Sequence, residues 1–158
     1  MTDKELWDKY KKECGIDEDK YDAWAFGGDP DELSNLVMRG IKTATASAGI
    51  LYEMDNEPLP PVNGYNVILN SKGEAVCITQ TTRVYIVPFS CVTEEQAYKE
   101  GEGDRSLLHW RDVHKRFFTK ELAKAGLDFD ENMDVVCEEF RLVYKAISAN
   151  VIDMPQLI

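Results

Sequence analysis

The chain has 158 residues, the size of one ordinary globular domain, and is long enough to bury a hydrophobic core. It carries 18 Lys and Arg against 29 Asp and Glu, which gives a net charge of −11. That balance argues against non-specific coating of nucleic acid and against binding to an anionic membrane, because both need a broad basic surface, but it allows a small basic pocket.

The first third of the chain contains two predicted helices. Residues 3–14 have the spacing of an amphipathic helix. An acidic segment at 17–32 contains the run WAFGG and then an Asp-Pro pair at 29–30, which favours the start of a second helix that ends at Gly40. The small and β-branched residues 41–47 suit a short strand or a tight connection.

The middle of the chain contains strands. Residues 49–56 suit one or two helical turns, and a proline-rich loop follows them. Residues 65–69 and 75–89 are predicted strands joined by a turn, with a bend near residues 81–82. A short helix over 93–100 begins with a Thr-x-x-Gln capping box.

The last third is predicted to hold a long helix and a final strand. The helix runs from about 106 to 125, with Asp104 or Ser106 as its cap, and the strand covers 134–144. The tail at 145–158 has no clear pattern. We therefore predict a single domain of the α+β class. Its curved, mostly antiparallel sheet of five or six strands is of a kind that often closes into a barrel.

The amino-terminal sequence and the cysteines predict a cytoplasmic protein. The charged start has no apolar core of a secretory signal, and no stretch approaches the roughly 20 apolar residues of a transmembrane helix. The cysteines are widely spaced, which is typical of reduced thiols rather than of a disulfide framework or a zinc site. They are Cys14, Cys77, Cys91 and Cys137.

The segment from Arg39 to Ser47 is the first candidate site. Gly40 at a helix end precedes Lys42, and Thr45 follows three residues later. A lysine partly removed from water can act as a base, and it could activate Thr45 as a nucleophile if the chain coils tightly. The same spacing also suits a solvated lysine beside a strand threonine.

The run EGEGD at 100–104 is the second candidate. Its glycines let the backbone turn, so that Glu100 or Glu102 could enter a pocket as acid, base or ligand to an exocyclic amine. It could also hold a divalent cation, although the spacing differs from that of an EF-hand. The alternative is a solvent-facing acidic turn.

The third candidate is a basic stretch with interleaved aromatic residues, from Trp110 to Phe118. Stacking on rings together with a cation for phosphate is how single-stranded RNA is usually held, which would use Trp110 and Arg111. The alternatives are core packing for the aromatics and a structural role for His114. Two histidines are too few for a His-rich metal site, so no metal is predicted.

Four motifs occur together in order, namely WAFG at 24–27, GIKTAT at 40–45, EGEGD at 100–104 and WRxxH before FF at 110–118. With these motifs the sequence resembles the ASCH (ASC-1 homology) domain family in its longer bacterial form, over residues 20–144. The resemblance implies a PUA-like β-barrel with surrounding helices and a ligand cleft beside the GxKxxT motif.

The resemblance also implies an activity. Some small relatives are amidohydrolases that deacetylate N4-acetylcytidine with a Lys, a Thr and a Glu. By motif match these are Lys42 and Thr45, and the Glu falls on Glu100, with Glu102 as its rival. At least one longer relative is a metal-assisted ribonuclease, so the family alone does not assign the reaction.

Three hypotheses follow. The first is an amidohydrolase acting on an acylated nucleoside, and the second is a single-stranded RNA-binding module or ribonuclease with carboxylates around a divalent metal. The third is a non-catalytic ligand-sensing domain. No cofactor is expected except that metal in the ribonuclease case; the partner is a nucleoside or single-stranded RNA, and the oligomeric state is not predicted. The residues expected to contact a ligand are Trp24, Arg39, Ser47, Glu102, Arg105, Trp110, Arg111 and His114.

Overall fold

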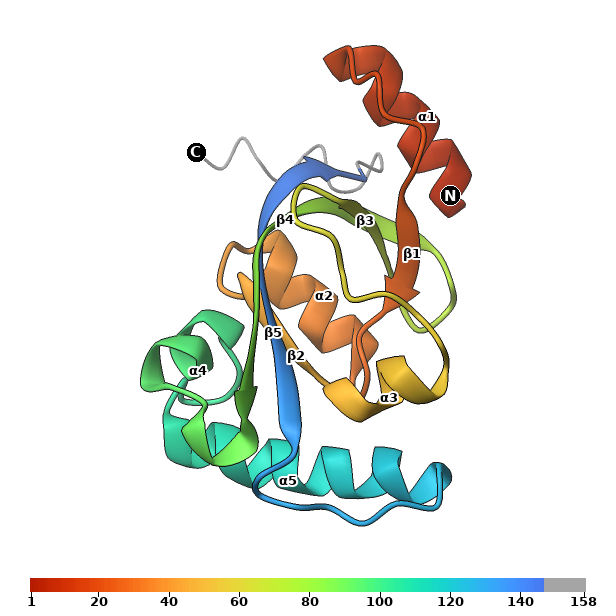
Figure 1. The fold of residues 1–158 in the computed structure, drawn as a ribbon. Coiled ribbons are helices and arrows are strands. Elements are labelled where there is room, and N and C mark those ends of the chain that lie inside the picture. The colour runs from red at the N-terminus through yellow and green to blue at the C-terminus, as the bar shows by residue number, and fades with distance from the viewer. Residues whose placement is uncertain (147–158) are drawn as a thin grey trace.

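The structure, a computed structural model, describes residues 1–146 as an α+β fold with a five-stranded sheet (Figure 1). Along the sheet the strands follow the order β1-β3-β4-β5-β2. β1 runs parallel to β3, and the other neighbours are antiparallel, which confirms the mixed, mostly antiparallel sheet. The strands are β1 (Asp22–Ala25), β2 (Ala44–Ala48), β3 (Tyr65–Leu69), β4 (Ala75–Pro88) and β5 (Asp134–Lys145).

The sheet curls into a half-barrel. The pairing of β4 with β5 shifts register between Thr81 and Arg83, which places a bulge where the sequence predicts a bend. A second shift lies between Ile78 and Thr79. Within residues 1–146 the edge strands β1 and β2 do not pair with each other, so the predicted barrel is open on that side.

The helices lie near the predicted positions. Figure 1 shows α1 at one end of the sheet and α5 across the other end. None of the helices in the part of the chain that was described is long and apolar enough to cross a membrane. The helices are α1 (Asp3–Cys14), α2 (Pro30–Met38), α3 (Gly49–Met54), α4 (Glu94–Glu100) and α5 (Leu107–Lys124), with a 3₁₀ turn at Phe89–Cys91.

The hydrophobic core falls into three clusters along the sheet. α1 buries Leu6 and Trp7 at one end, α2 buries Val37 near the middle, and α5 buries Trp110 and Phe118 at the other end. Because α5 is anchored by these large rings, its inward face is fixed against the ends of β2 and β5. That face carries part of the candidate site.

The structure differs from the sequence prediction at β1, and it leaves part of the carboxy-terminal tail undescribed. Strand β1 was missed, because its four residues Asp22–Ala25 are too few to show a period and the parallel partner β3 lies far along the chain. The predicted tail at 145–158 lies outside the described residues from position 147 onward, while β5 extends to Lys145.

Candidate functional site

Lys42 lies in the connection from α2 to β2, which is tied down at both ends. The amides of Ile41 and Lys42 donate to the carbonyl oxygen of Leu36 at 2.9 and 3.1 Å. The amide of Thr43 donates to the carbonyl oxygen of Lys99 in α4 at 2.7 Å. With its backbone held in this way, the Lys42 side chain is buried and only 1% exposed.

Glu100 is the last residue of α4, and Gly101 turns the chain away from the helix. Gly101 has a φ of +75°, and a Cβ there would lie 2.7 Å from the carbonyl oxygen of Ile41, so the close approach and the backbone angle both require glycine. The turn buries Glu100, which is 1% exposed, and brings the partly exposed Glu102 beside it.

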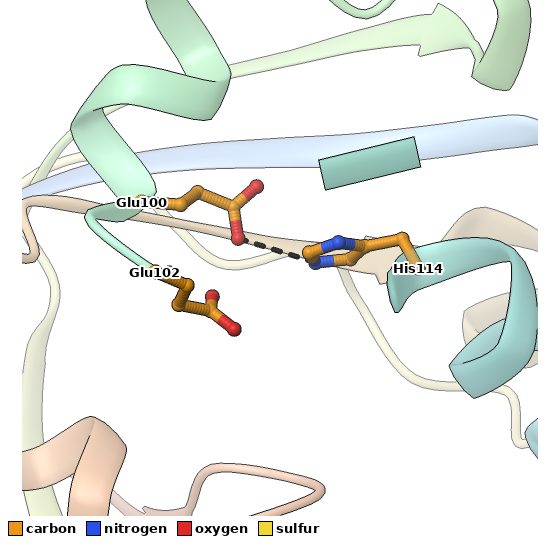
Figure 2. A group of neighbouring side chains, drawn as sticks. All are labelled: Glu100, Glu102 and His114. Atoms are coloured by element: carbon orange, nitrogen blue, oxygen red, sulfur yellow. Dashed lines mark ion pairs between the residues drawn. The ribbon is translucent and has the colours of Figure 1, made fainter. Parts of the chain in front are cut away.

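Two carboxylates and two basic side chains meet at this point. Lys42 Nζ donates to Glu102 Oε2 at 3.0 Å and lies 3.5 Å from Glu100 Oε1. His114 Nε2, from α5, lies 3.3 Å from the same Glu100 oxygen, a contact that Figure 2 draws as a dashed line. We call Lys42, Glu100, Glu102 and His114 the lysine cluster.

Glu100 is the centre of the lysine cluster. Its Oε2 accepts hydrogen bonds from Trp110 Nε1 at 2.5 Å and from Gln96 Nε2 at 3.1 Å. Its Oε1 has no aligned hydrogen bond within residues 1–146 and is held by charge between Lys42 and His114. Burial alone would raise the pKa of Glu100, but the two cations and the hydrogen bonds outweigh it and lower the pKa to about 2. Glu100 is therefore a carboxylate.

His114 is oriented by the helix that carries it. Its Nδ1 lies 2.9 Å from the carbonyl oxygen of Trp110, which can only accept, so Nδ1 carries a proton. Its ring stacks on the indole of Trp110 with centroids 4.1 Å apart. Burial lowers the pKa of His114, but the close carboxylate of Glu100 and the charge of Glu102 raise it overall. The rings of Trp110 and His114 thus contact Glu100 and do not form an exposed surface for stacking.

This arrangement predicts that the free energy of unfolding falls as the pH rises above neutral. Because the pKa of His114 is raised in the folded state, its stabilising contribution is complete below the ordinary value of 6.5 and is lost as the pH rises through the folded value. Urea unfolding of wild type and of His114→Asn between pH 6 and 9 measures this. The variant should lose the slope, and His109→Asn, at the other histidine, should keep it. Equal slopes in wild type and His114→Asn would contradict the assignment.

The lysine cluster also offers possible metal ligands. Glu100, Glu102 and His114 each present one ligand atom, all within 4.8 Å of one another. However, Lys42 Nζ already lies within 3.5 Å of both carboxylates, and together with a protonated His114 it balances their charge. A metal would have to displace the ammonium group, so these residues do not fit a divalent cation as they stand.

A cavity of about 550 Å³ lies between the edge strands β1 and β2. Trp24 and Phe26 line it from the β1 side, and Thr45 and Ser47 line it from β2. Lys42 Nζ lies 5.2 Å from the centre of the Phe26 ring, so the lysine cluster lies behind the wall of the cavity. A cavity of this size suits a small organic ligand.

The charges around the cavity are acidic. Its lining holds the carboxyl groups of Asp22, Glu57 and Glu138, and among the described residues that line it there is no Lys, Arg or His. Such a lining favours neutral or cationic ligands and disfavours phosphate groups.

The predicted site residues fall into three groups. The first group comprises the lysine cluster, which is Lys42, Glu100, Glu102 and His114, together with Trp110, which donates to Glu100. The cavity is lined by Trp24, Thr45 and Ser47. Outside both lie Arg39, Arg105 and Arg111. The predicted nucleophile Thr45 and the predicted base Lys42 thus lie on two sides of one wall.

The arginines outside the site have other partners. Arg105 donates to the carbonyl oxygens of Tyr98 at 2.9 Å and Ile41 at 3.3 Å, so it holds the loop after α4. Arg111 is exposed and donates to a carbonyl of the 3₁₀ turn, and Arg39 is exposed at the end of α2. Arg105 and Arg111 therefore support the backbone around the site.

A second hollow, of about 690 Å³, lies on the outer face of α5. We call it the basic groove, after the side chains Lys115, Arg116, Lys120 and Lys124 that line it. Phe117 lines both the basic groove and the cavity, and its ring lies where a Cβ on Gly27 would approach within 2.5 Å. The two hollows are therefore neighbours that share one aromatic side chain.

Sequence reasoning missed two buried polar residues at the site. Gln96 was assigned to a capping box, but only the Thr93 half of that box forms, and the Gln96 amide donates instead to Glu100 and to the carbonyl oxygen of Thr45. Glu138, in β5, lines the cavity opposite Thr45. An acidic residue at a buried position of an apolar strand was the available indication.

Comparison with known proteins agrees with the resemblance noted in the sequence. The family model for the ASCH domain matches residues 22–144. The crystal structure of an ASCH domain from Lactobacillus crispatus JV V101 is 31% identical with a TM-score of 0.81, and the match covers 90% of this chain and 94% of that chain. A protein from Enterococcus faecalis V583 is 34% identical with a TM-score of 0.83, covering 90% and 88%. No curated protein matches this chain. The two structural matches confirm the PUA-like α+β fold.

Proposed function

Since the chain belongs to the ASCH domain family, we propose that it is an amidohydrolase that acts on an N-acylated nucleoside of the N4-acetylcytidine type. ASCH domains are generally associated with RNA, which supports a ligand that carries a nucleobase. The observation that carries the proposal is the position of Thr45, which lines the cavity together with the ring of Trp24. A ring for stacking beside a hydroxyl group is what an acylated base requires.

The charge of the cavity supports a free nucleoside over a polymer. The carboxyl groups of Asp22, Glu57 and Glu138 would repel the phosphates of RNA, and none of the described lining residues supplies a cation to offset them. An uncharged nucleoside has no phosphate for these carboxyl groups to repel. A substrate with a 5′-phosphate is expected to be a poorer one.

The reaction assigns one role to each residue of the predicted catalytic set. Thr45 Oγ attacks the acyl carbon, so that a C–O bond forms and the C–N bond to the base breaks. Lys42, after passing a proton to the neighbouring Glu102, takes the hydroxyl proton and returns it to the leaving amine. Glu100 acts through Lys42 as a positioning residue, and water then releases the acyl group from Thr45. The acyl-enzyme step requires Lys42 Nζ to approach Thr45 past Phe26 when the substrate is bound.

The experiment that tests the proposal is release of cytidine from N4-acetylcytidine by the purified full chain, followed by chromatography. Turnover is expected from the wild type without added metal. A short single-stranded RNA with Mn²⁺ serves as the parallel substrate. Cleavage of that RNA with no release of cytidine would replace the amidohydrolase with a ribonuclease.

A second function, binding of single-stranded RNA, is favoured by the basic groove. Lys115, Arg116, Lys120 and Lys124 line the groove next to the cavity. Arg116 and Lys124 are paired with Asp112 and Glu121, so Lys115 and Lys120 are the cations that could hold phosphates while a base enters past Phe117. Under this hypothesis a short oligonucleotide binds with an affinity that falls steeply with salt. Lys115→Glu/Lys120→Glu should abolish that binding. Binding that is unchanged between 50 and 200 mM salt would argue against it.

A further inference from the structure

Glu138 is a buried acidic residue of the cavity that the proposed reaction does not use. It lies in β5 directly opposite Thr45 of β2 in the antiparallel pairing, so the two side chains lie on the same face of the sheet and are neighbours. Both line the cavity, and Glu138 is only 6% exposed. A buried carboxyl group beside the predicted nucleophile is well placed to touch whatever Thr45 touches.

A chain of hydrogen bonds fixes the orientation of this carboxyl group. Trp24 Nε1 can only donate, and it donates to Asn66 Oδ1 at 3.0 Å. The Asn66 amide nitrogen therefore points the other way and donates to Thr81 Oγ1 at 3.1 Å. Thr81 Oγ1 then donates its single hydroxyl proton to Glu138 Oε2, at 2.6 Å. Oε2 is thus an acceptor, and any proton on Glu138 must lie on Oε1.

The other oxygen, Oε1, is the one left for a ligand. Within residues 1–146 it makes no hydrogen bond or ion pair with the protein, although the side chain is buried and lines the cavity. The titratable groups that face it are Asp22 of β1, Glu57 of the loop after α3, and Tyr52 of α3. None of the three is a cation. The protein therefore leaves this oxygen without a partner.

We propose that Glu138 recognises the exocyclic group of the bound base, with Oε1 accepting a hydrogen bond from an amino or amide N–H. The inference rests on the proposed function, because the exocyclic nitrogen is bonded to the acyl carbon and must lie beside Thr45 when that carbon is attacked. Carboxylates pair in this way with the exocyclic amino group of cytosine. A base with a carbonyl oxygen at the same position would place two acceptors against each other. The cavity thus selects cytosine-type bases over uracil-type bases.

The environment of Glu138 makes this selection dependent on pH. Burial raises the pKa of Glu138, the hydrogen bond from Thr81 lowers it, and the charge of Asp22 raises it further. Below that raised pKa the proton lies on Oε1, and Glu138 becomes a donor that suits a carbonyl oxygen. The preference for cytidine should therefore weaken as the pH falls through that raised pKa.

Calorimetric titration of the full chain with cytidine and with uridine tests the proposal. Wild type at pH 8 should bind cytidine about tenfold more tightly than uridine. In Glu138→Gln the amide oxygen must accept from Thr81, so the NH₂ group faces the cavity and the preference should reverse. Glu139→Gln is the matched control, because Glu139 pairs with Arg83 and Lys99 outside the cavity. It should bind as wild type does.

Three results would overturn the inference: equal affinity of wild type for the two nucleosides, no binding of either at millimolar concentration, or a wild-type preference in Glu138→Gln. The pH series on unmodified protein provides a second measurement that needs no variant. Release of cytidine from N4-acetylcytidine is scored separately. A preference for cytidine without turnover would rule out the amidohydrolase and leave Glu138 as a recognition residue. Turnover without the preference would support the amidohydrolase and rule out recognition by Glu138.

Discussion

Replacing Thr45 with valine is expected to reduce the release of cytidine from N4-acetylcytidine by about 1000-fold or more, because the variant removes the attacking oxygen and little else. Valine matches threonine in shape and suits the β2 strand, and the Thr45 backbone keeps its bond from Gln96. The effect should fall on kcat, since the wall of the cavity is preserved. Initial rates at several substrate concentrations measure it.

Two matched variants separate nucleophilic chemistry from loss of packing. Thr45→Ser retains a hydroxyl group and should keep much of the activity. Ser47→Ala removes a hydroxyl from the same strand and cavity, one that is bound to Tyr52 at 2.8 Å, and should be mild. If Thr45→Val keeps wild-type turnover, Thr45 is not the nucleophile. If Ser47→Ala is the variant that loses turnover, the nucleophile has been assigned to the wrong position in β2.

The parts of the fold that repeat over many residues could be predicted from the sequence. The apolar period of α5 extends over 18 residues, so it outweighs local exceptions, and β4 could be recognised by its length of 14 residues although its buried positions alternate only in part. The bend in β4 was also predicted, and it coincides with the register shift after Thr81. Strand β1, in contrast, has four residues and owes its place to a parallel neighbour, β3, that no local pattern identifies.

The candidate site was predicted only as far as single segments allow. The motifs identified Lys42, Glu100 and His114. The sequence alone does not show that the Glu100 carboxylate lies between Lys42 and His114. The sequence left open whether the aromatic residues of α5 stack on a ligand or pack in the core, and the helical period turns Trp110 inward and Arg111 outward. Contacts of this kind depend on pairing between distant elements, as the position of Glu138 opposite Thr45 also does.

Replacing Lys42 with methionine is expected to lower the free energy of unfolding by roughly 3–5 kcal/mol. The loss arises because the substitution leaves the Glu100 carboxylate buried without its lysine partner. Glu100 is 1% exposed, and without the ammonium group its carboxylate keeps only His114 as a cation. Taking one member from a buried pair leaves an uncompensated charge, which costs far more than the pair itself contributes. Urea unfolding at pH 7 measures the loss.

The matched control is Lys99→Met. Lys99 also bridges two carboxylates, those of Glu95 and Glu139, but its side chain is 32% exposed and so remains in contact with water, and its loss should cost less than about 1 kcal/mol. The double variant Lys42→Met/Glu100→Gln removes both charges and should recover much of the stability that Lys42→Met loses. Equal losses in Lys42→Met and Lys99→Met would contradict the assignment. A double variant less stable than Lys42→Met would show that Glu100 is stabilised mainly by Trp110 and Gln96 rather than by the lysine.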